Sequence, residues 1–159
     1  SSRITQRRLR YAIAENATQE LLQKRILVDM VDPRGILTAA SNEQYGKQMS
    51  ISELGRAVDA DIVIYAVVTD FSMTPEAGAY LPRCSMRVKL VETNTGERLW
   101  PNDERGHMVN VQIPQRPGTG PATSGDRVEI EQSLSERAGL GLAQLFYKHE
   151  IQETVLFRR

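Results

Sequence analysis

Cysteine and histidine are scarce in this chain of 159 residues, which contains one cysteine and two histidines. A single cysteine forms no internal disulfide, and Cys84 belongs to no CxxC motif of the kind that binds zinc or exchanges disulfides. His107 and His149 lie too far apart in the sequence to supply the clustered ligands of a structural zinc site. The sequence therefore predicts no bound metal and no other cofactor.

Long apolar runs and an excess of one sign of charge are also missing. No apolar stretch approaches the roughly 20 residues that a membrane-spanning helix needs. Twenty basic and twenty acidic residues cancel, so no overall field attracts nucleic acid or anionic lipid. We interpret the basic cluster from Arg3 to Arg10 as the solvated surface of a helix. Nucleic acid is therefore not expected as a partner.

The remaining composition is that of an ordinary packed protein, with 40% hydrophobic and 25% charged residues. The length is typical of one domain, and we predict a single α/β domain over residues 1–159. Prolines and glycines gather at residues 114–125, which predicts a mobile loop there. The tail at residues 149–159 has apolar positions but no assigned structure.

Apolar residues recur at helical spacing in two long segments. They are Leu9, Ile13, Ala17 and Leu21 in the first, and Ile130, Leu134, Ala138 and Leu145 in the second. We expect helices over residues 4–22 and 126–148. Gly139 and Gly141 each cost about 1 kcal/mol of helix propensity, which we attribute to close packing of the second helix on a sheet.

Shorter helical segments are expected between these two. Residues 35–45 predict one or two helical turns, and a further helix begins near Ser50. The hydroxyl of Ser50 can accept a hydrogen bond from a free backbone N–H, and Glu53 completes a capping box. This pattern fixes the start of that helix more closely than periodicity does.

Three segments have strand patterns. Residues 25–31 form a short apolar run closed by Asp32 and Pro33, which predicts a strand. Residues 62–68 are continuously apolar and rich in β-branched side chains, which is typical of a central strand covered on both faces. Residues 84–91 alternate between apolar and polar, as in a strand with one buried face.

A hairpin is expected after the third of these strands. Residues 92–97 include Asn94 and Gly96, which tolerate the backbone conformations of a tight turn. Residues 98–100 begin the return strand, and Pro101 interrupts it before pairing resumes near residues 108–113. The order of elements predicts an α/β (α+β) fold: a mixed sheet of about four strands with helices packed on it.

The residues that could carry chemistry are few. Cys84 alternates with polar neighbours like a small core residue, so we interpret it as a buried, inert thiol. His107 lies in an expected loop and is the only plausible general base for a hydrolase or transferase built on the scattered carboxylates. The candidates for contact with a partner are Tyr80, in the loop from Pro75 to Pro82, Trp100 and His107.

Two segments together resemble a known family. Residues 54–71, LGRAVDADIVIYAVVTDF, and residues 90–100, LVETNTGERLW, resemble a helix-to-strand step and a hairpin of bacterial envelope proteins with the TolB amino-terminal fold. That group includes the curli secretion lipoprotein and the outer-membrane lipoprotein activators of penicillin-binding proteins. The chain departs from the family where glycine is common, at Asp59 and Ala66, and it lacks an expected first strand before the first helix.

The resemblance implies a non-enzymatic domain of the periplasm or outer membrane. Such a domain is the soluble part of a lipoprotein, meets the membrane only through an upstream lipidated cysteine, and acts through contacts with an envelope protein. One alternative is a cytoplasmic small-molecule-binding or regulatory domain whose loop at 114–125 closes over its ligand; the other is the hydrolase or transferase above. Self-association is a further possibility, since Val155, Leu156 and Phe157 could cover a neighbouring subunit or complete the core.

Overall fold

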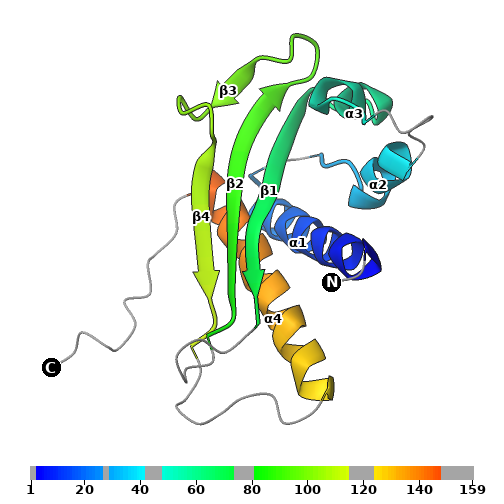
Figure 1. Cartoon of the computed structure of the whole chain (residues 1–159). Coiled ribbons are helices and arrows are strands. Elements are labelled where there is room, and N and C mark those ends of the chain that lie inside the picture. Colours follow the sequence, from blue (N-terminus) through cyan, green and yellow to red (C-terminus); the bar gives the residue numbers. More distant parts are fainter. Residues whose placement is uncertain (1–2, 27–28, 42–47, 74–80, 115–123, 148–159) are drawn as a thin grey trace, which may run out of the picture.

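A computed structural model of the chain describes residues 3–26, 29–41, 48–73, 81–114 and 124–147. Its elements in chain order are α1 (Arg3–Gln23), α2 (Pro33–Ser41), α3 (Ile51–Ala57), β1 (Ile62–Ser72), β2 (Arg83–Glu92), β3 (Arg98–Trp100), β4 (His107–Gln112), α4 (Ser124–Ala143) and the 3-10 helix η2 (Gln144–Phe146). Figure 1 shows the strands side by side, with α1 and α4 behind them. The expected α/β class, with four strands and helices packed on the sheet, is confirmed.

The sheet is built around β2. Strand β1 pairs with β2 on one side, and both β3 and β4 pair with it on the other, β4 along residues 83–88 and β3 at residues 90–91. All of these pairs are antiparallel, so the expectation of a mixed sheet was wrong. A parallel neighbour required the strand expected at residues 25–31, and no described residue of that stretch lies in a strand.

The apolar run at residues 25–31 follows a helix terminus that the sequence did not reveal. Arg25 adopts a left-handed conformation with φ of 53°. The N–H of Ile26 donates to the carbonyl of Leu21 at 3.1 Å, and the N–H of Arg25 donates to that of Leu22 at 3.1 Å. This pair of bonds is a Schellman motif, which usually places glycine where Arg25 stands. The chain therefore turns away from α1 without entering the sheet.

Strand β1 lies at the edge of the described sheet, although its apolar run predicted a central position. It pairs with β2 alone, and Ile62 and Val67 are 51% and 42% exposed. Ile64, Ala66 and Val68 pack against the core, while the residues between them point the other way. Helix α3 covers one end of the other face of β1, at Val63, which accounts for an apolar residue on that face.

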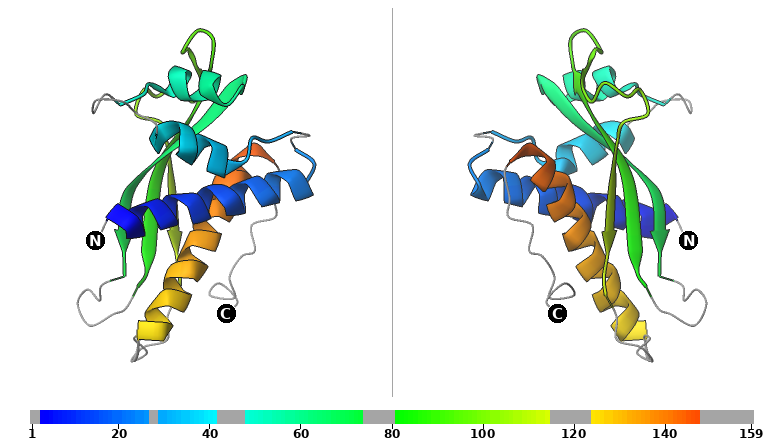
Figure 2. Two further views of the ribbon diagram at one scale, coloured as in Figure 1. Left: turned by 90° about the vertical axis from the view of Figure 1, so that its right-hand side faces the viewer. Right: turned by 90° about the vertical axis from the view of Figure 1, so that its left-hand side faces the viewer.

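The core lies between the sheet and two helices. Cys84, Met86 and Val88 alternate along β2 and are fully buried, as the period of two predicted. They pack with residues of α4 and α1, namely Leu134, Ala138, Leu142, Ile13 and Ala17. Figure 2 shows α1 and α4 crossing on the same side of the sheet. Burial of side chains of this size contributes roughly 1.5–3 kcal/mol each.

The two glycines of α4 have different neighbours. A Cβ on Gly141 would lie 3.0 Å from Cγ1 of Val111 in β4, so this glycine packs on the sheet as expected. A Cβ on Gly139 would lie 2.6 Å from Cβ of Asn16 and 2.8 Å from the carbonyl oxygen of Ile13. Gly139 therefore allows the backbones of α1 and α4 to approach each other, and its expected packing on the sheet was wrong.

Helix α3 covers one end of the opposite face of the sheet. It begins with the predicted capping box, in which the N–H of Glu53 donates to Ser50 Oγ at 3.1 Å and the N–H of Ser50 donates to Glu53 Oε2 at 2.7 Å. Gly55 brings the helix close to the sheet, since a Cβ there would lie 2.9 Å from Cγ2 of Val63 and 2.6 Å from Oγ1 of Thr93.

The loop expected at residues 114–125 and the tail at 149–159 lie largely outside the described residues. Helix α4 begins at Ser124, so the last two residues of the loop expected at 114–125 are helical. Residues 115–123 of that loop and the tail at 149–159 lie outside the described residues. Within the described ranges, no helix is both long and apolar enough to span a membrane.

Candidate interaction surface

The face of the sheet turned away from α1 and α4 carries a mixed set of polar and apolar side chains, here called the outer face. The register of the strands assigns to it Tyr65, Val67 and Asp70 of β1, Arg83, Ser85, Arg87 and Lys89 of β2, and Met108, Asn110 and Gln112 of β4. This face is turned toward the viewer in Figure 1, where no described helix crosses in front of β4, β2 or the lower part of β1. An antiparallel sheet can expose one face in this way.

Arg87 lies at the middle of the outer face between two exposed apolar residues. It pairs with Val67 across β1 and with Met108 across β4, and these two are 42% and 38% exposed. Lys89, two residues further along β2, pairs with Tyr65, and its Nζ lies 5.4 Å from the centre of the tyrosine ring. This distance is within the range of a cation–π contact.

Polar side chains at the other end of the outer face bind one another. Nε of Arg83 lies 2.7 Å from Oδ2 of Asp70, an ion pair that neutralises this arginine. The hydroxyl of Ser85 donates to Oδ1 of Asn110 at 2.7 Å. A bulge at Thr69 sets this register, because residue 68 pairs with Met86 and residue 70 with Ser85.

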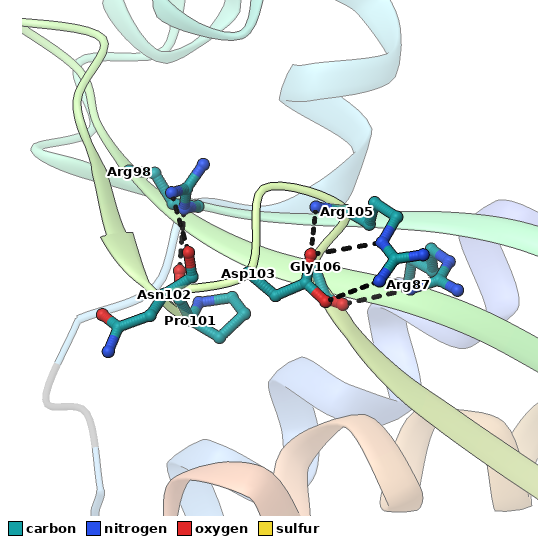
Figure 3. A network of polar contacts seen from close by, with 7 residues as sticks. All are labelled: Arg87, Arg98, Pro101, Asn102, Asp103, Arg105 and Gly106. Carbon is teal, nitrogen blue, oxygen red and sulfur yellow. Dashed lines mark hydrogen bonds and ion pairs between the residues drawn. The ribbon is translucent and has the colours of Figure 1, made fainter.

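Arginines hold the connection between β3 and β4, which Figure 3 shows from close by. Nε of Arg98 donates to the carbonyl oxygen of Pro101 at 2.7 Å, and its Nη2 donates to that of Asn102 at 3.1 Å. Nη1 of Arg87 donates to the carbonyl oxygen of Gly106 at 3.3 Å. These acceptors are neutral, so both guanidinium groups remain positively charged without a carboxylate in these contacts.

The same connection contains one acidic side chain with a partner of its own. Oδ1 of Asp103 accepts from the backbone N–H of Arg105 at 2.9 Å and from its Nε at 3.4 Å. The backbone N–H of Arg105, its guanidinium and the more distant charge of Arg87 lower the pKa of Asp103. The carboxylate of Asp103 is thus engaged chiefly by Arg105.

Trp100 and His107, two of the predicted contact residues, lie next to each other. Their ring centroids are 5.1 Å apart, and the ring of Phe146 in η2 lies 6.3 Å from that of Trp100. Trp100 pairs with Leu90 and His107 with Val88, which places both on the side of the sheet that carries α4. They therefore lie on the face opposite the outer face.

The other predictions for single residues have mixed outcomes. His107 is exposed, but it is the first residue of β4, so its expected place in a loop was wrong. Tyr80 lies outside the described residues. Cys84 is fully buried, as expected, and its burial, together with the charge of Asp70, raises the pKa of its thiol to about 12. A thiol with this pKa is a poor nucleophile at neutral pH.

The described part of the chain has no arrangement of side chains suited to a metal ion. No group of three or more histidine, cysteine, aspartate or glutamate side chains within it could hold one. The acidic residue next to the core, Asp70, is paired with Arg83 instead. The outer face, with its charged and exposed apolar side chains, is therefore the candidate functional site.

Sequence reasoning did not find the outer face as a site. The alternation along β2 did place Ser85, Arg87 and Lys89 on one side of the strand. The neighbours of these residues depend on which strands flank β2 and on the bulge at Thr69, and neither has a signal in the sequence. The flanking of Arg87 by Val67 and Met108 could therefore be seen only in three dimensions.

The side chains of Tyr147 and Cys84 lead us to expect a loss of stability at alkaline pH. Burial, a hydrogen bond to Glu20 and the charge of that residue raise the pKa of Tyr147 to about 12, as burial does for Cys84. In the unfolded chain these groups release their protons near pH 10.0 and 9.0 respectively. Their contribution to stability is therefore complete below about pH 9 and is lost as the pH rises toward 12.

Urea unfolding at a series of pH values from 8 to about 11 measures this loss. Tyr147→Phe removes the hydroxyl that donates to Glu20 Oε1 at 2.8 Å, so the variant starts less stable by about 1 kcal/mol. Its free energy of unfolding then falls less steeply above about pH 10 than that of the wild type. Parallel curves for the two proteins would contradict a role for Tyr147.

Comparison with known proteins finds no family model, no curated protein and no solved structure that matches the chain.

Proposed function

We propose that this chain is a non-enzymatic interaction domain that binds another protein through the outer face of its sheet. The observation that carries the proposal is the exposure of Val67 and Met108 on either side of Arg87. Contiguous apolar surface rimmed by polar groups is typical of sites that bind other proteins, and the methylene stem of Arg87 joins the two apolar side chains here. Because these residues stand on paired strands, they are already held in place, which lowers the entropic cost of binding.

The proposed place of action is the bacterial envelope, where the domain is the soluble part of a lipoprotein in the periplasm or at the outer membrane. This rests on the resemblance of residues 54–71 and 90–100 to envelope proteins with the TolB amino-terminal fold. The two segments pack together, since Val63 pairs with Val91 and the N–H of Thr93 donates to the carbonyl of Asp61 at 2.9 Å. Contact between them is what a shared structural motif requires.

One departure from that family also has a physical explanation. Asp59 follows α3 with φ of 56°, in the left-handed region that glycine adopts without strain. The N–H of Ala60 donates to the carbonyl of Gly55 at 2.9 Å, and that of Asp59 donates to Arg56 at 3.2 Å, the bonds of a Schellman motif. Asp59 thus occupies a backbone position that favours glycine, and this agrees with the glycine that is common in the family at this position.

Photo-crosslinking in the cells that encode the chain tests the interaction. A photoreactive amino acid replaces Met108 on the outer face or, as a matched control, Gln132 on the exposed side of α4. We expect a crosslinked protein from position 108 and none from position 132. A protein captured equally from both positions, or from position 132 alone, would contradict a role for the outer face.

The location is tested separately on the product of the complete gene. Cells are fed an alkyne fatty acid and fractionated, and the tagged protein is isolated. We expect the fatty acid on the protein and the protein in the membrane fraction, accessible to protease after the outer membrane is opened. An unlabelled protein in the cytoplasmic fraction would exclude the lipoprotein proposal and leave the interaction domain to be judged by crosslinking.

A further inference from the structure

We propose that the outer face recognises an extended acidic polypeptide segment with carboxylate side chains at alternate positions. This inference rests on the proposed function and names the chemistry of the partner. It follows from three features of the outer face: its net charge, the state of its cations and the apolar residues beside them.

The outer face is positively charged in a chain whose formal net charge is zero. Its cations are Arg83, Arg87 and Lys89, and its acidic residue is Asp70. Asp70 is bound to Arg83, so the excess charge lies at Arg87 and Lys89. Positive potential on one face attracts a partner of the opposite sign and orients it before contact.

Within the described part of the chain, no ion pair joins Arg87, Lys89 or Arg98 to a carboxylate; the carboxylate of Asp103 interacts with the charge of Arg87 from further away and is bound by Arg105. Arg87 donates to the neutral carbonyl of Gly106, and Lys89 lies over the ring of Tyr65. Arg98, which pairs with Val91 two residues after Lys89 on β2, donates to two neutral carbonyls. These contacts fix the positions of the cations without neutralising them. Carboxylates of a partner can therefore form charge-assisted hydrogen bonds there.

The spacing of the cations fits an extended ligand. Arg87 and Lys89 are two residues apart on one strand and face the same side, which separates them by roughly 7 Å. Carboxylates two residues apart in an extended peptide have the same separation. Val67 and Met108 lie on either side of Arg87, so the methylene groups of those carboxylate side chains have apolar surface to cover.

Nucleic acid is the other polyanion that a basic sheet could bind, and the outer face suits it poorly. Sheets that bind single strands combine positive charge with several aromatic side chains on which bases stack. Tyr65 is the only aromatic residue assigned to the outer face in the described chain, and Lys89 lies over its ring. The exposed apolar residues beside Arg87 are aliphatic, which favours a polypeptide.

Fluorescence anisotropy with the full chain tests the proposal. The probe is a short fluorescein-labelled peptide in which glutamate alternates with valine and threonine, and the matched peptide carries glutamine for every glutamate. We expect the acidic peptide to bind, more weakly as salt is added, and the glutamine peptide to bind about tenfold or more less tightly.

Variants of the chain locate the site. Arg87→Gln combined with Lys89→Gln is expected to weaken binding of the acidic peptide about tenfold or more. The control combines Arg7→Gln with Arg10→Gln, which removes the same charge from exposed residues of α1 and is expected to change affinity less than about twofold. Met108→Glu places a negative charge beside Arg87, which repels the carboxylates of the peptide, and is also expected to weaken binding. Circular dichroism checks that each variant is folded.

Three results would overturn the inference. They are no binding of the acidic peptide to the folded wild type, equal losses in the outer-face and control variants, and tighter binding of a single-stranded oligonucleotide at the same residues. A crosslinked partner captured through position 108 but lacking an acidic segment would leave the proposed function standing and remove only this inference. Loss of every crosslink, with peptide binding intact, would instead remove the proposed function.

Discussion

Gly139→Ala is expected to lower the free energy of unfolding by about 2–3 kcal/mol. The added methyl group would lie 2.6 Å from Cβ of Asn16, 2.8 Å from the carbonyl oxygen of Ile13 and 3.0 Å from the backbone nitrogen of Ala17. Two of these atoms belong to the backbone of α1, so relief requires the helices to separate. This cost exceeds the roughly 1 kcal/mol that alanine gains in helix propensity. Urea unfolding measures the difference, and the melting temperature should fall by roughly 5–10 °C.

Gly35→Ala is the matched control for this substitution. Gly35 is also helical, but a Cβ there meets nothing closer than Cγ1 of Val31 at 3.9 Å. The substitution is expected to be neutral or to stabilise the protein by about 0.5–1 kcal/mol, because alanine restricts the unfolded chain. If Gly139→Ala behaves like Gly35→Ala, α1 and α4 do not approach as closely as the structure shows.

Leu134→Ala is expected to lower the free energy of unfolding by about 2–5 kcal/mol. Leu134 lies on α4, is 0% exposed and belongs to the core cluster with Met86 of β2 and Ile13 of α1. Truncation removes buried apolar surface and leaves a cavity between three elements that cannot all move inward. Chemical unfolding followed by circular dichroism gives the change in stability.

Leu140→Ala tests whether that loss comes from burial. Leu140 lies on the same helix and is 38% exposed, so the same truncation should cost less than about 1 kcal/mol. Equal losses at the two positions would mean that α4 is rotated about its axis relative to the arrangement described. The pair of variants thus checks which side of α4 faces the sheet.

The features predicted correctly from the sequence are those whose signal is local. Ser50 and Glu53 form a capping box because both partners lie within one helical turn. Gly96 adopts φ of 72° in the hairpin turn, and the alternation along β2 follows from the geometry of a single strand. Each pattern is satisfied by a few neighbouring residues, so no knowledge of the rest of the fold was needed.

The features that the sequence did not predict depend on distant parts of the chain. Residues 62–68 have the composition of a central strand, but part of their second face is covered by Gly55 of α3 instead of a full layer. Arg25 ends α1 in a conformation that glycine usually adopts, so the sequence does not indicate the helix terminus and predicts a strand in the apolar run that follows. The outer face also depends on distant parts of the chain, since the neighbours of Arg87 come from the strands on both sides of β2.

The position of Trp100 provides a built-in reporter of one junction. It is the only tryptophan in the chain, and its ring lies against His107 of β4 and near Phe146 of η2, where strands and the end of the last helical segment meet. Its intrinsic fluorescence therefore responds to separation of that segment from the sheet, whereas circular dichroism responds to loss of helices throughout. Coincident transitions by the two signals would show that this end unfolds together with the core. An earlier fluorescence change would identify it as a locally opening unit.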